Sequence, residues 1–470
     1  MRYIIGVDIG TSGTKTVLFD ENGRIVRSAY AEYPISQPQN GYAEQDPEDW
    51  SRAAIKTIDE VIGDEPISSI GLSGQMHGLV MLDSENRVIR PSIIWCDQRT
   101  EPQCRELDAL FGREKLIEVT ANPPLTGFTA SKILWVKENE PENFAKCKHI
   151  LLPKDYVRFV LTGEFATDFS DASGMQLLDV PKRKWAYELA EKVGVSRDML
   201  PRLCESTEIT GYYKGIPVAA GGGDNACAAV GSGTVASGRA FTTIGTSGVV
   251  YAHTDLPIID PRGRIHTFCS AVPGAWHVMG VTQAAGLSLG WFRKNFAPEL
   301  SYRELDALCE EIPIGADGLF YLPYLMGERT PHLDPNVRGA FLGISAMHTR
   351  AHFVRAVMEG VTYSLRDCLE VFSELGLDPD TMSAVGGGAK SPLWQQLLAD
   401  VFDTEILSLD ISEGAALGAA ILGGVGAGVF ESVGAACDVL VHSKAKVLPK
   451  SADAYASRYA VFKTLYDRIK

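Results

Sequence analysis

The chain has 470 residues, of which 45% are hydrophobic and 22% are charged, and its formal net charge at pH 7 is −15. This length exceeds what one hydrophobic core usually supports, so two globular domains are expected. The negative charge argues against a general binder of nucleic acid or of anionic membranes. No run of about 20 uninterrupted apolar residues is present, so no membrane-spanning helix is expected.

The cysteines and the N-terminus indicate a compartment. Nine cysteines without a Cys-x-x-Cys pair predict reduced thiols rather than a disulfide framework. A strand pattern begins directly at the N-terminus, so no signal peptide is expected. A cytoplasmic location is therefore favoured.

The first predicted element is a β-hairpin over residues 4–20, with a Gly-Thr-Ser-Gly turn at 10–13. Such a turn can direct backbone N–H groups and the hydroxyls of Thr11 and Ser12 toward one point, which suits a phosphate. Asp8 ends the first strand, where a carboxylate could hold a metal ion against that phosphate. A plain surface hairpin is the alternative for this segment alone.

A second copy of the turn changes that balance. Ile-Gly-Thr-Ser-Gly occurs at residues 9–13 and again at 244–248, each time between strand patterns. The offset, 244 − 9 = 235, is half of the 470-residue chain. This repeat predicts an ancient duplication, with two phosphate-binding turns facing one cleft, the second built around Gly245 and Thr246.

A strand predicted over residues 67–72 leads into Ser73-Gly-Gln-Met-His-Gly78. Gln75 and a neutral His77 can each donate and accept hydrogen bonds, so they can bind hydroxyl groups. Flanking glycines allow a ligand to approach the backbone. A packed or surface histidine without a ligand is the alternative.

The helices predicted in the first half carry weaker chemical signals. Asp46-Pro47 is typical of a helix N-terminus, and a second helix is expected over 155–161. Lys132 could contact an anion, but a solvent-exposed helix lysine is the favoured interpretation. Residues 166–174 form a polar, turn-rich segment that could line a cleft or cap helices.

Three glycines, at 221–223, precede Asp224 and Asn225, directly after a buried-strand pattern at 216–220. They let the backbone turn sharply and bring the Asp224 carboxylate close to a ligand. The segment also imitates a dinucleotide-binding fingerprint. That motif needs an acidic residue about 20 positions later. No Asp or Glu lies between Asp224 and Asp255, so this alternative is weak.

The second half begins with the repeated hairpin and continues with a glycine-broken helix at 283–293, which contains Gly286. A loop rich in glycine, proline and charged residues follows at 327–335. An amphipathic helix is predicted over 352–375. Residues 383–394 predict a strand, a glycine loop and a helix, a junction that places backbone amides against an anion or a nucleotide.

Two further helices are expected near the C-terminus. Residues 414–423 are almost all small, which suits close crossing of this helix against another helix and is interpreted as packing between the domains. Residues 451–470 predict an amphipathic helix. No Walker A motif and no His/Cys metal cluster is present. Phosphate chemistry would have to come from the two hairpins, the glycines at 386–388, Asp8 and Asp224.

These motifs resemble the FGGY family of carbohydrate kinases, within the larger group of actin-like ATPases. One family pattern matches residues 127–139, centred on Lys132 and Trp135. The other matches 339–344 and continues through 352–359. Order and spacing agree over essentially the whole chain, although Cys96 is not the residue expected at its position.

The resemblance implies an α/β fold of two actin-like (ribonuclease H-like) ATPase domains flanking a deep cleft. Residues 1–219 would form the sugar side and residues 220–470 the nucleotide side, with the last helix packing back on the first domain. Asp224 would be the catalytic base and Asp8 would organise Mg²⁺. The implied nucleotide-binding residues are Thr11, Ser12, Gly245, Thr246, Gly286, Gly388 and Ala389. The implied sugar-binding residues are Gln75, Met76, His77, Asp224 and Asn225.

Within the family, residues 74–78 and 221–225 are most similar to the kinases of xylulose, which implies phosphorylation of D-xylulose to D-xylulose 5-phosphate. Glycerol kinases carry Arg-Glu where Met76 and His77 lie, so glycerol is disfavoured. Ribulose and erythritol stay open as substrates. A non-catalytic actin-like ATPase is a further alternative, but it would not need polar groups at 75–77 or a carboxylate at 224. The implied partners are a small sugar and ATP, and a homodimer is left open.

Overall fold

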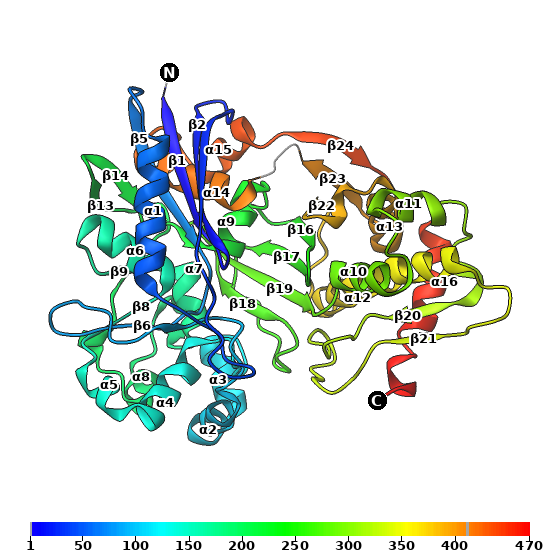
Figure 1. The fold of residues 1–470 in the computed structure, drawn as a ribbon, viewed down its shortest axis with the longest axis horizontal. Coiled ribbons are helices and arrows are strands. Elements are labelled where there is room, and N and C mark those ends of the chain that lie inside the picture. Colours follow the sequence, from blue (N-terminus) through cyan, green and yellow to red (C-terminus); the bar gives the residue numbers. More distant parts are fainter. Residues whose placement is uncertain (1, 410–412) are drawn as a thin grey trace.

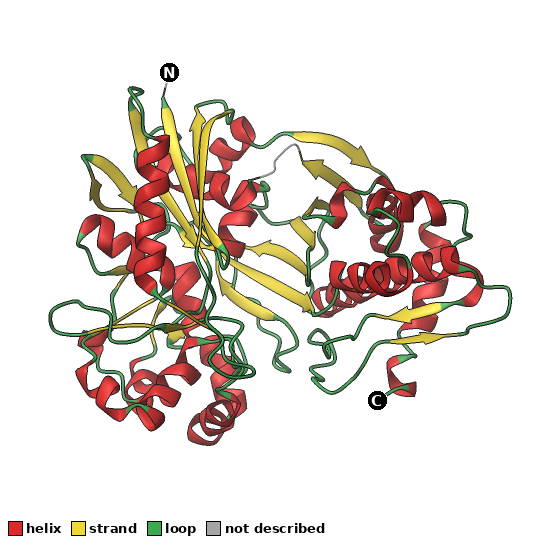
Figure 2. Ribbon diagram, viewed as in Figure 1, coloured by secondary structure: helices red, strands yellow, loops and turns green. Residues whose placement is uncertain are grey.

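Two mixed β-sheets, each flanked by helices, form the centre of the computed structural model, which describes residues 2–409 and 413–470 (Figures 1 and 2). The first sheet has the order β13-β14-β5-β1-β2-β3, and a short strand, β15, also pairs with β5. Strand β1 runs antiparallel to β2 and parallel to β5. Its strands are β1 (Tyr3–Ile9), β2 (Gly13–Asp20), β3 (Ile25–Glu32), β5 (Ile67–Gly74), β13 (Ile209–Tyr213), β14 (Ile216–Ala219) and β15 (Gly222–Gly223).

The second sheet repeats this plan, in the order β18-β19-β17-β16-β22-β23-β24. Strand β16 runs antiparallel to β17 and parallel to β22, as β1 does with β2 and β5. The matching strand order confirms the pair of related α/β domains that the repeat predicts. Its strands are β16 (Arg239–Ile244), β17 (Gly248–Thr254), β18 (His266–Cys269), β19 (Trp276–Thr282), β22 (Thr381–Val385), β23 (Glu405–Leu409) and β24 (Ser443–Val447).

The identical pentapeptides close their hairpins differently. In the first hairpin Ile9 pairs with Thr14, whereas in the second Ile244 pairs with Gly248. The first turn is closed by a hydrogen bond from Gly10 N to Gly13 O, and the second by one from Gly245 N to Ser247 O. The second turn is therefore one residue tighter, although its letters are the same.

Helix α1 (Pro47–Val61) begins as predicted. Asp46 caps it by accepting a hydrogen bond from Glu48 N at 2.9 Å, and the helix packs on β2 and β3. In the second half, α12 (Arg350–Glu374) occupies the corresponding place in the chain order, between β19 and β22. The two crossover helices thus follow the same plan as the sheets.

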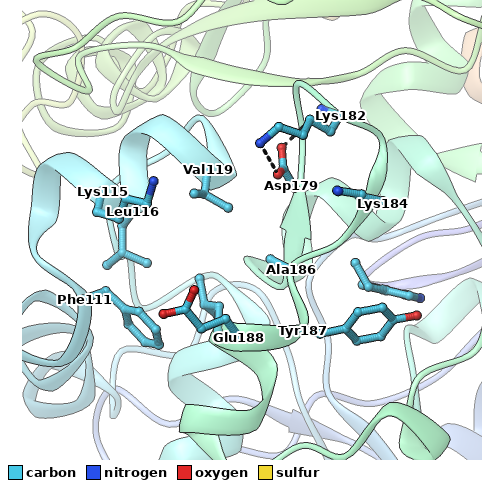
Figure 3. Close-up of a pocket in the computed structure, with 12 residues that line it drawn as sticks. Phe111, Lys115, Leu116, Val119, Asp179, Lys182, Lys184, Ala186, Tyr187 and Glu188 are labelled. Carbon is cyan, nitrogen blue, oxygen red and sulfur yellow. Dashed lines mark hydrogen bonds and ion pairs between the residues drawn. The ribbon is translucent and has the colours of Figure 1, made fainter.

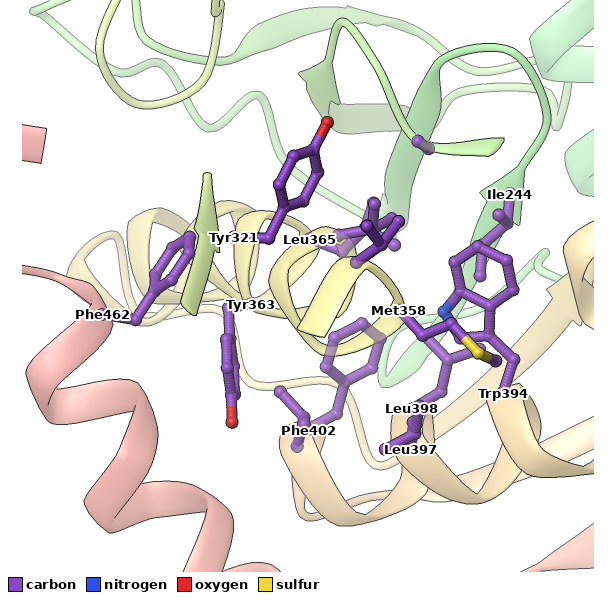
Figure 4. Close-up of a cluster of buried hydrophobic side chains, with 14 of the residues drawn as sticks. Ile244, Tyr321, Met358, Tyr363, Leu365, Trp394, Leu397, Leu398, Phe402 and Phe462 are labelled. Atoms are coloured by element: carbon purple, nitrogen blue, oxygen red, sulfur yellow. The ribbon is translucent and has the colours of Figure 1, made fainter. Parts of the chain in front are cut away.

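Helix α12 was expected to be amphipathic, but most of its circumference is buried. It is enclosed by β20 (Phe320–Leu322), α10 (Gly286–Phe296), α11 (Tyr302–Cys309) and α13 (Pro392–Phe402). Figure 4 shows this core, where Met358 and Leu365 of α12 lie near Trp394 and Leu398 of α13. The sequence pattern marks the most apolar face, while the packing of surrounding elements decides how much of the helix is covered.

Helix α14 (Gly414–Gly426) belongs to the second half of the sequence but packs on β1 and β5 of the first sheet, and on α9 (Asp224–Gly231). A Cβ atom on Gly418 would overlap the backbone carbonyl of Cys227, and one on Gly231 would overlap that of Gly414. Ala229 of α9 packs in turn with Phe241 of the second sheet. The small-residue helix therefore joins the two halves closely, as predicted.

The last helix, α16 (Ala452–Phe462), does not pack back on the first domain, and that prediction is wrong. It packs against α12 and α13. The rings of Tyr455, Tyr459 and Phe462 lie near Tyr363 of α12, and Tyr459 Oη donates to Asp367 Oδ1 at 2.6 Å. The aromatic face of α16 packs into the core of the second half, and α14 is the C-terminal helix that packs on the first sheet.

Between β5 and β13 the chain inserts a mostly helical region, which appears in cyan in Figure 1. Its helices are α2 (Glu101–Phe111), α3 (Arg113–Thr120), α4 (Thr129–Asn139), α5 (Pro141–Lys146), α6 (Pro153–Thr162), α7 (Phe169–Ala172) and α8 (Tyr187–Val193). Short paired strands connect them: β6 (Val80–Leu82), β7 (Ser92–Ile93), β8 (His149–Leu151), β9 (Ala166–Asp168), β10 (Leu178–Asp179), β11 (Lys184–Trp185) and β12 (Arg202–Cys204).

The remaining strands and α-helix are β4 (Glu44–Gln45), β21 (Ala340–Leu342) and α15 (Val433–Leu440). All nine cysteines are unpaired, as expected. Across the helices in residues 2–409 and 413–470, none has both the length and the apolarity to cross a membrane.

Candidate functional site

Parallel pairing brings the two predicted carboxylates to one edge of the first sheet. Asp8 of β1 lies opposite Ser73 of β5, and Gly223 of β15 lies opposite Gly74. Because Asp224 follows Gly223 directly, it starts α9 at the same edge. Ser73 Oγ donates to Asp8 Oδ1 at 2.9 Å. Residues from three distant parts of the chain thus meet at one point.

The two carboxylates influence each other electrostatically. Burial and the negative charge of Asp8 raise the pKa of Asp224 to about 7. Burial also raises the pKa of Asp8, and the charge of Glu413 adds to this effect. Asn225 stabilises the Asp224 carboxylate by donating from its backbone N at 2.7 Å and from Nδ2 at 3.0 Å. A like-charged, partly buried pair of this kind favours a proton or a cation between its members.

A buried polar network anchors the turn that carries Asp224. Gly223 N donates to Ser170 Oγ at 3.2 Å, and Ser170 Oγ donates to Asp168 Oδ2 at 2.5 Å. Lys154 Nζ lies 3.1 Å from Asp168 Oδ1 and donates to Ala220 O at 3.2 Å. The side chains of Lys154 and Asp168 are fully buried. The polar segment at 166–174 therefore both caps α7, through Asp168, and supports the turn.

Met76 and His77 form a wall beside this edge. A Cβ atom on Gly223 would come within 2.8 Å of Met76 Cγ, so Met76 packs directly on the glycine turn. The His77 ring packs edge-on against Phe128, with centroids 4.9 Å apart. Its Nδ1 lies 3.1 Å from the carbonyl oxygen of Gly174.

The protonation state of His77 follows from these neighbours. Burial, with the nearby charge of Lys132, lowers its pKa well below the usual value, so the ring is neutral. A carbonyl oxygen can only accept, so the proton belongs on Nδ1. Nε2 is then left as a hydrogen-bond acceptor, which suits a sugar hydroxyl.

Lys132 is not solvent-exposed, and the favoured interpretation of it was wrong. Its side chain is fully buried, and desolvation lowers its pKa to about 7. Its Nζ donates to the backbone carbonyls of His77, at 2.9 Å, and of Gly127, at 2.5 Å. The first turn of α4 faces the His77 turn, so the lysine supports the wall from behind. Helical periodicity does not distinguish such a lysine from a surface one, and the family pattern centred on Lys132 was the available signal.

Gln75 lies apart from the His77 ring. It is 1% exposed, its Nε2 donates to Gln45 Oε1 at 2.8 Å, and its backbone N donates to Ile9 O at 2.8 Å. Gln45 Nε2 in turn donates to Thr11 O at 2.7 Å. Gln75 therefore supports the first turn, while Met76 and the half-buried His77 form the wall beside the carboxylates.

A cavity of about 900 Å³ lies against the second sheet. Gly245, Thr246, Gly286 and Gly388, four of the expected nucleotide-binding residues, line it, and much of the rest of its wall is apolar. Gly286 N donates to Gly245 O at 2.7 Å, and a Cβ atom on Gly286 would lie 2.5 Å from that oxygen. The volume suits a ligand of nucleotide size. Ala389 is buried directly beside Gly388 and does not line the cavity.

Thr11 and Ser12 do not line this cavity. Thr11 Oγ1 accepts a hydrogen bond from Trp95 Nε1 at 2.9 Å, whereas Ser12 is exposed at the tip of the first turn. Lys15, one strand later, forms an ion pair with Glu413 at the start of α14. The structure thus places the first turn with the carboxylates and the second turn with the large cavity.

A divalent cation fits the Asp8–Asp224 edge. Within the described residues, no three His, Cys, Asp or Glu side chains gather into a group that could hold a metal. Mg²⁺ is commonly held by one or two carboxylates together with the phosphates of a nucleotide. Two carboxylates whose pKa values are raised supply the protein's share of such a site.

A second cavity, of about 360 Å³, lies in the inserted helical region (Figure 3). Phe111 and Lys115 form one side of it, and Lys182, which pairs with Asp179 at 2.9 Å, lies on the other. None of the residues expected at the site lines it. The lysines that line this cavity are surface residues, so no function is assigned to the cavity.

Comparison with known proteins identifies the relatives of this chain. Residues 3–231 match the N-terminal domain of the FGGY family of carbohydrate kinases, and residues 240–427 match the C-terminal domain of that family. The xylulose kinase of Bacillus subtilis is 42% identical, over 100% of this chain and 98% of its own length.

Two solved structures share the fold over nearly the whole length. The xylulose kinase of Rhodospirillum rubrum is 29% identical with a TM-score of 0.93, covering 99% of each chain. A gluconate kinase of Lactobacillus acidophilus is 26% identical with a TM-score of 0.94, covering 99% of this chain and 98% of its own.

Proposed function

Because the chain belongs to the FGGY family of carbohydrate kinases, we propose that it transfers the γ-phosphoryl group of ATP to the terminal hydroxyl of D-xylulose, giving D-xylulose 5-phosphate. One observation carries the site assignment: Asp224 starts α9 beside the Met76–His77 wall, at the sheet edge that also holds Asp8. A polar wall and a basic carboxylate are what a sugar kinase needs.

Asp224 acts as the general base. Its raised pKa makes it a stronger proton acceptor than an ordinary carboxylate while leaving much of it ionised near neutral pH. It takes the proton of the terminal hydroxyl as that oxygen forms a bond to the γ-phosphorus. The bond from the γ-phosphorus to the β–γ bridging oxygen breaks, and ADP leaves with that electron pair. The network of Ser170, Asp168 and Lys154 keeps the base in place.

The sugar is bound on the side of the first sheet. His77 accepts a hydroxyl hydrogen bond at Nε2, since Gly174 fixes the proton on Nδ1. Asn225 and Met76 complete this side, one beside the base and one against the glycine turn. Lys132 holds the His77 carbonyl, so the wall is rigid before the sugar arrives.

The nucleotide is bound on the side of the second sheet, and the metal would lie at the Asp8–Asp224 edge of the first sheet. The adenosine occupies the cavity lined by Gly286 and Gly388, with Gly245 and Thr246 near the phosphates, and Thr11 and Ser12 approach the phosphates from the first sheet. Asp8 would hold Mg²⁺, which neutralises phosphate charge during transfer. In this proposal the domains divide at residues 219 and 220, and α14 packs across the division on β1 and β5.

The choice of sugar rests on sequence similarity to xylulose kinases. The gluconate kinase fold superimposes as well as the xylulose kinase fold, so the backbone alone does not select the sugar. A coupled assay of ADP release, run with D-xylulose, D-ribulose, erythritol, gluconate and glycerol, tests the proposal. We expect the highest kcat/KM with D-xylulose. A better substrate among the others would replace the sugar, and sugar-independent ATP hydrolysis would favour a non-catalytic ATPase.

Location and assembly complete the proposal. Nine unpaired cysteines support a reducing compartment such as the cytoplasm. A homodimer is supported only by exposed apolar side chains such as Ile344 and Met347, which are 62% and 60% exposed. Sedimentation equilibrium measures the mass of the protein in solution directly. A monomer at micromolar concentration would contradict the proposed homodimer.

A further inference from the structure

The loop at residues 327–335 is fixed tightly to the end of β19. Glu328 is 3% exposed, and its carboxylate accepts hydrogen bonds from Thr282 Oγ1 at 2.6 Å and from Gln283 N at 2.9 Å. Ser364 Oγ of α12 donates to the same carboxylate at 3.1 Å. The residue that precedes Arg329 is therefore held in place by several hydrogen bonds to its buried carboxylate.

Thr330, the residue that follows Arg329, is also held in place. Its backbone N donates to Val281 O at 3.0 Å, and its Oγ1 accepts from Val281 N at 3.1 Å. The same hydroxyl donates to Arg264 O at 2.7 Å. With both neighbours held, the backbone of Arg329 has a defined position, and its side chain is presented from a rigid frame.

This frame adjoins the sugar wall. Val281 packs in one buried cluster with Phe128 and Phe268, and the Phe128 ring lies 4.9 Å from that of His77. The positive charge of Arg329 also contributes to lowering the pKa values of both His77 and His266, in agreement with this packing. A cation from the second half thus reaches the wall built by the first half.

The guanidinium itself is unpaired. Arg329 is half-buried, and it alone among the buried and half-buried arginines of residues 2–409 and 413–470 has no side-chain hydrogen bond or ion pair. Other half-buried arginines are paired; Arg183, for example, holds Glu205 at 2.6 Å. Removing a cation from water without giving it a partner is costly, so a partly desolvated, unpaired guanidinium needs an explanation, and a bound ligand supplies one.

We propose that Arg329 is a sugar-binding residue, and that its guanidinium donates hydrogen bonds to the ketone and hydroxyl oxygens of the ketose. The inference rests on the proposed function and extends it to specificity. Asp224 and Nε2 of His77 are acceptors, whereas a ketone oxygen can only accept and needs a donor. The planar fork of Arg329 supplies donors alone. It therefore favours a ketose over the polyol of the same length.

Three variants test this role. Arg329→Met keeps the length of the side chain but removes every donor, while Arg329→Lys keeps the charge and loses the fork. Arg262→Met is the matched control, because Arg262 pairs with Glu374 on the surface and its side chain is 63% exposed. For each variant, KM for D-xylulose and for ATP, calorimetric binding of D-xylulose without nucleotide, activity on xylitol and the melting temperature are measured.

We expect Arg329→Met to raise the KM for D-xylulose by about 10- to 100-fold and to change the KM for ATP less than about twofold. The preference for D-xylulose over xylitol should fall, Arg329→Lys should lie between, and the control should match wild type. An unchanged sugar KM, an equal rise in both KM values or a large drop in melting temperature would overturn the role. Wild-type protein inactive on every ketose would overturn the proposed function and this role with it, whereas active wild type beside an unaffected variant overturns this role alone.

Discussion

Asp8 raises the pKa of Asp224: the two carboxylates meet because β1, β5 and β15 run parallel and end at one edge. The coupling gives the site two acids with different tasks. The pKa of Asp224 is about 7, which suits a general base near neutral pH. Asp8 supplies negative charge that would attract a metal ion.

Asp224→Asn should abolish most turnover. The amide keeps size and hydrogen bonding but cannot accept a proton, and loss of a general base costs roughly 10²- to 10⁴-fold. Calorimetric titration should still show binding of sugar and ATP. Asp64→Asn, an exposed change of the same kind, is the control. Retention of most turnover by Asp224→Asn would remove it from the chemical step.

The same substitution should change stability with pH in a defined direction. The pKa of Asp224 is raised from 3.8 to about 7 in the folded state, so its contribution is favourable below pH 3.8 and is lost as pH rises through 7. Asp224→Asn lacks this loss. It should therefore melt higher than wild type at pH 8, with the difference shrinking toward pH 5. A variant that melts lower at pH 8 would contradict the raised pKa.

Asp8→Asn should weaken Mg·ATP-dependent turnover and shift the pH profile. Removing the Asp8 charge lowers the pKa of Asp224, so the acid limb of kcat/KM should move to lower pH. The Mg²⁺ concentration needed for half-maximal rate should rise. Both are read from rate measurements over a grid of pH and Mg²⁺. An unmoved limb and a normal Mg²⁺ requirement would place Asp8 outside the site.

His77→Ala should affect the sugar far more than the nucleotide. A buried hydrogen-bonding partner left unpaired costs about 1–3 kcal/mol. The KM for D-xylulose should rise accordingly, while that for ATP should stay close to wild type. Steady-state kinetics with each substrate varied in turn separates the two. Equal effects on both would indicate a structural histidine.

Lys132→Met should weaken sugar binding without removing a sugar contact. It leaves the Gly127 carbonyl without its side-chain donor, at a cost of about 1–3 kcal/mol, and leaves Thr129 Oγ1 as the side-chain donor to the His77 carbonyl. We expect a lower melting temperature and a higher KM for D-xylulose. Lys137→Met, exposed on the same helix, is the matched control and should resemble wild type. Identical behaviour of the two variants would refute the supporting role.

Gly418→Ala should destabilise the contact between α14 and α9. Its Cβ would overlap the carbonyl of Cys227, and overpacking of this kind costs about 1–3 kcal/mol or more. Gly414→Ala on the same helix meets open space and should be neutral or mildly stabilising. Denaturant unfolding of both variants compares them. Equal stability would show that α9 and α14 separate without cost.

Local sequence was enough to predict the elements whose pattern is self-contained. The two hairpins follow from alternating β-branched runs around a repeated turn, and α1 begins at Asp46 because a capping carboxylate and Pro47 are adjacent in the chain. The small residues of α14 predict that this helix packs closely against another helix. The family resemblance added the roles of Asp8 and Asp224, which a pattern alone leaves open.

Only the tertiary structure decided which side chains become buried and what they meet. Lys132 has an ordinary helical sequence around it, yet it is buried because the carbonyls of His77 and Gly127 face it. Arg329 stands out only once Glu328 and Thr330 are seen anchored to β19. Burial and pairing of a side chain depend on elements that are far apart in the chain, so the local sequence around the residue does not predict them.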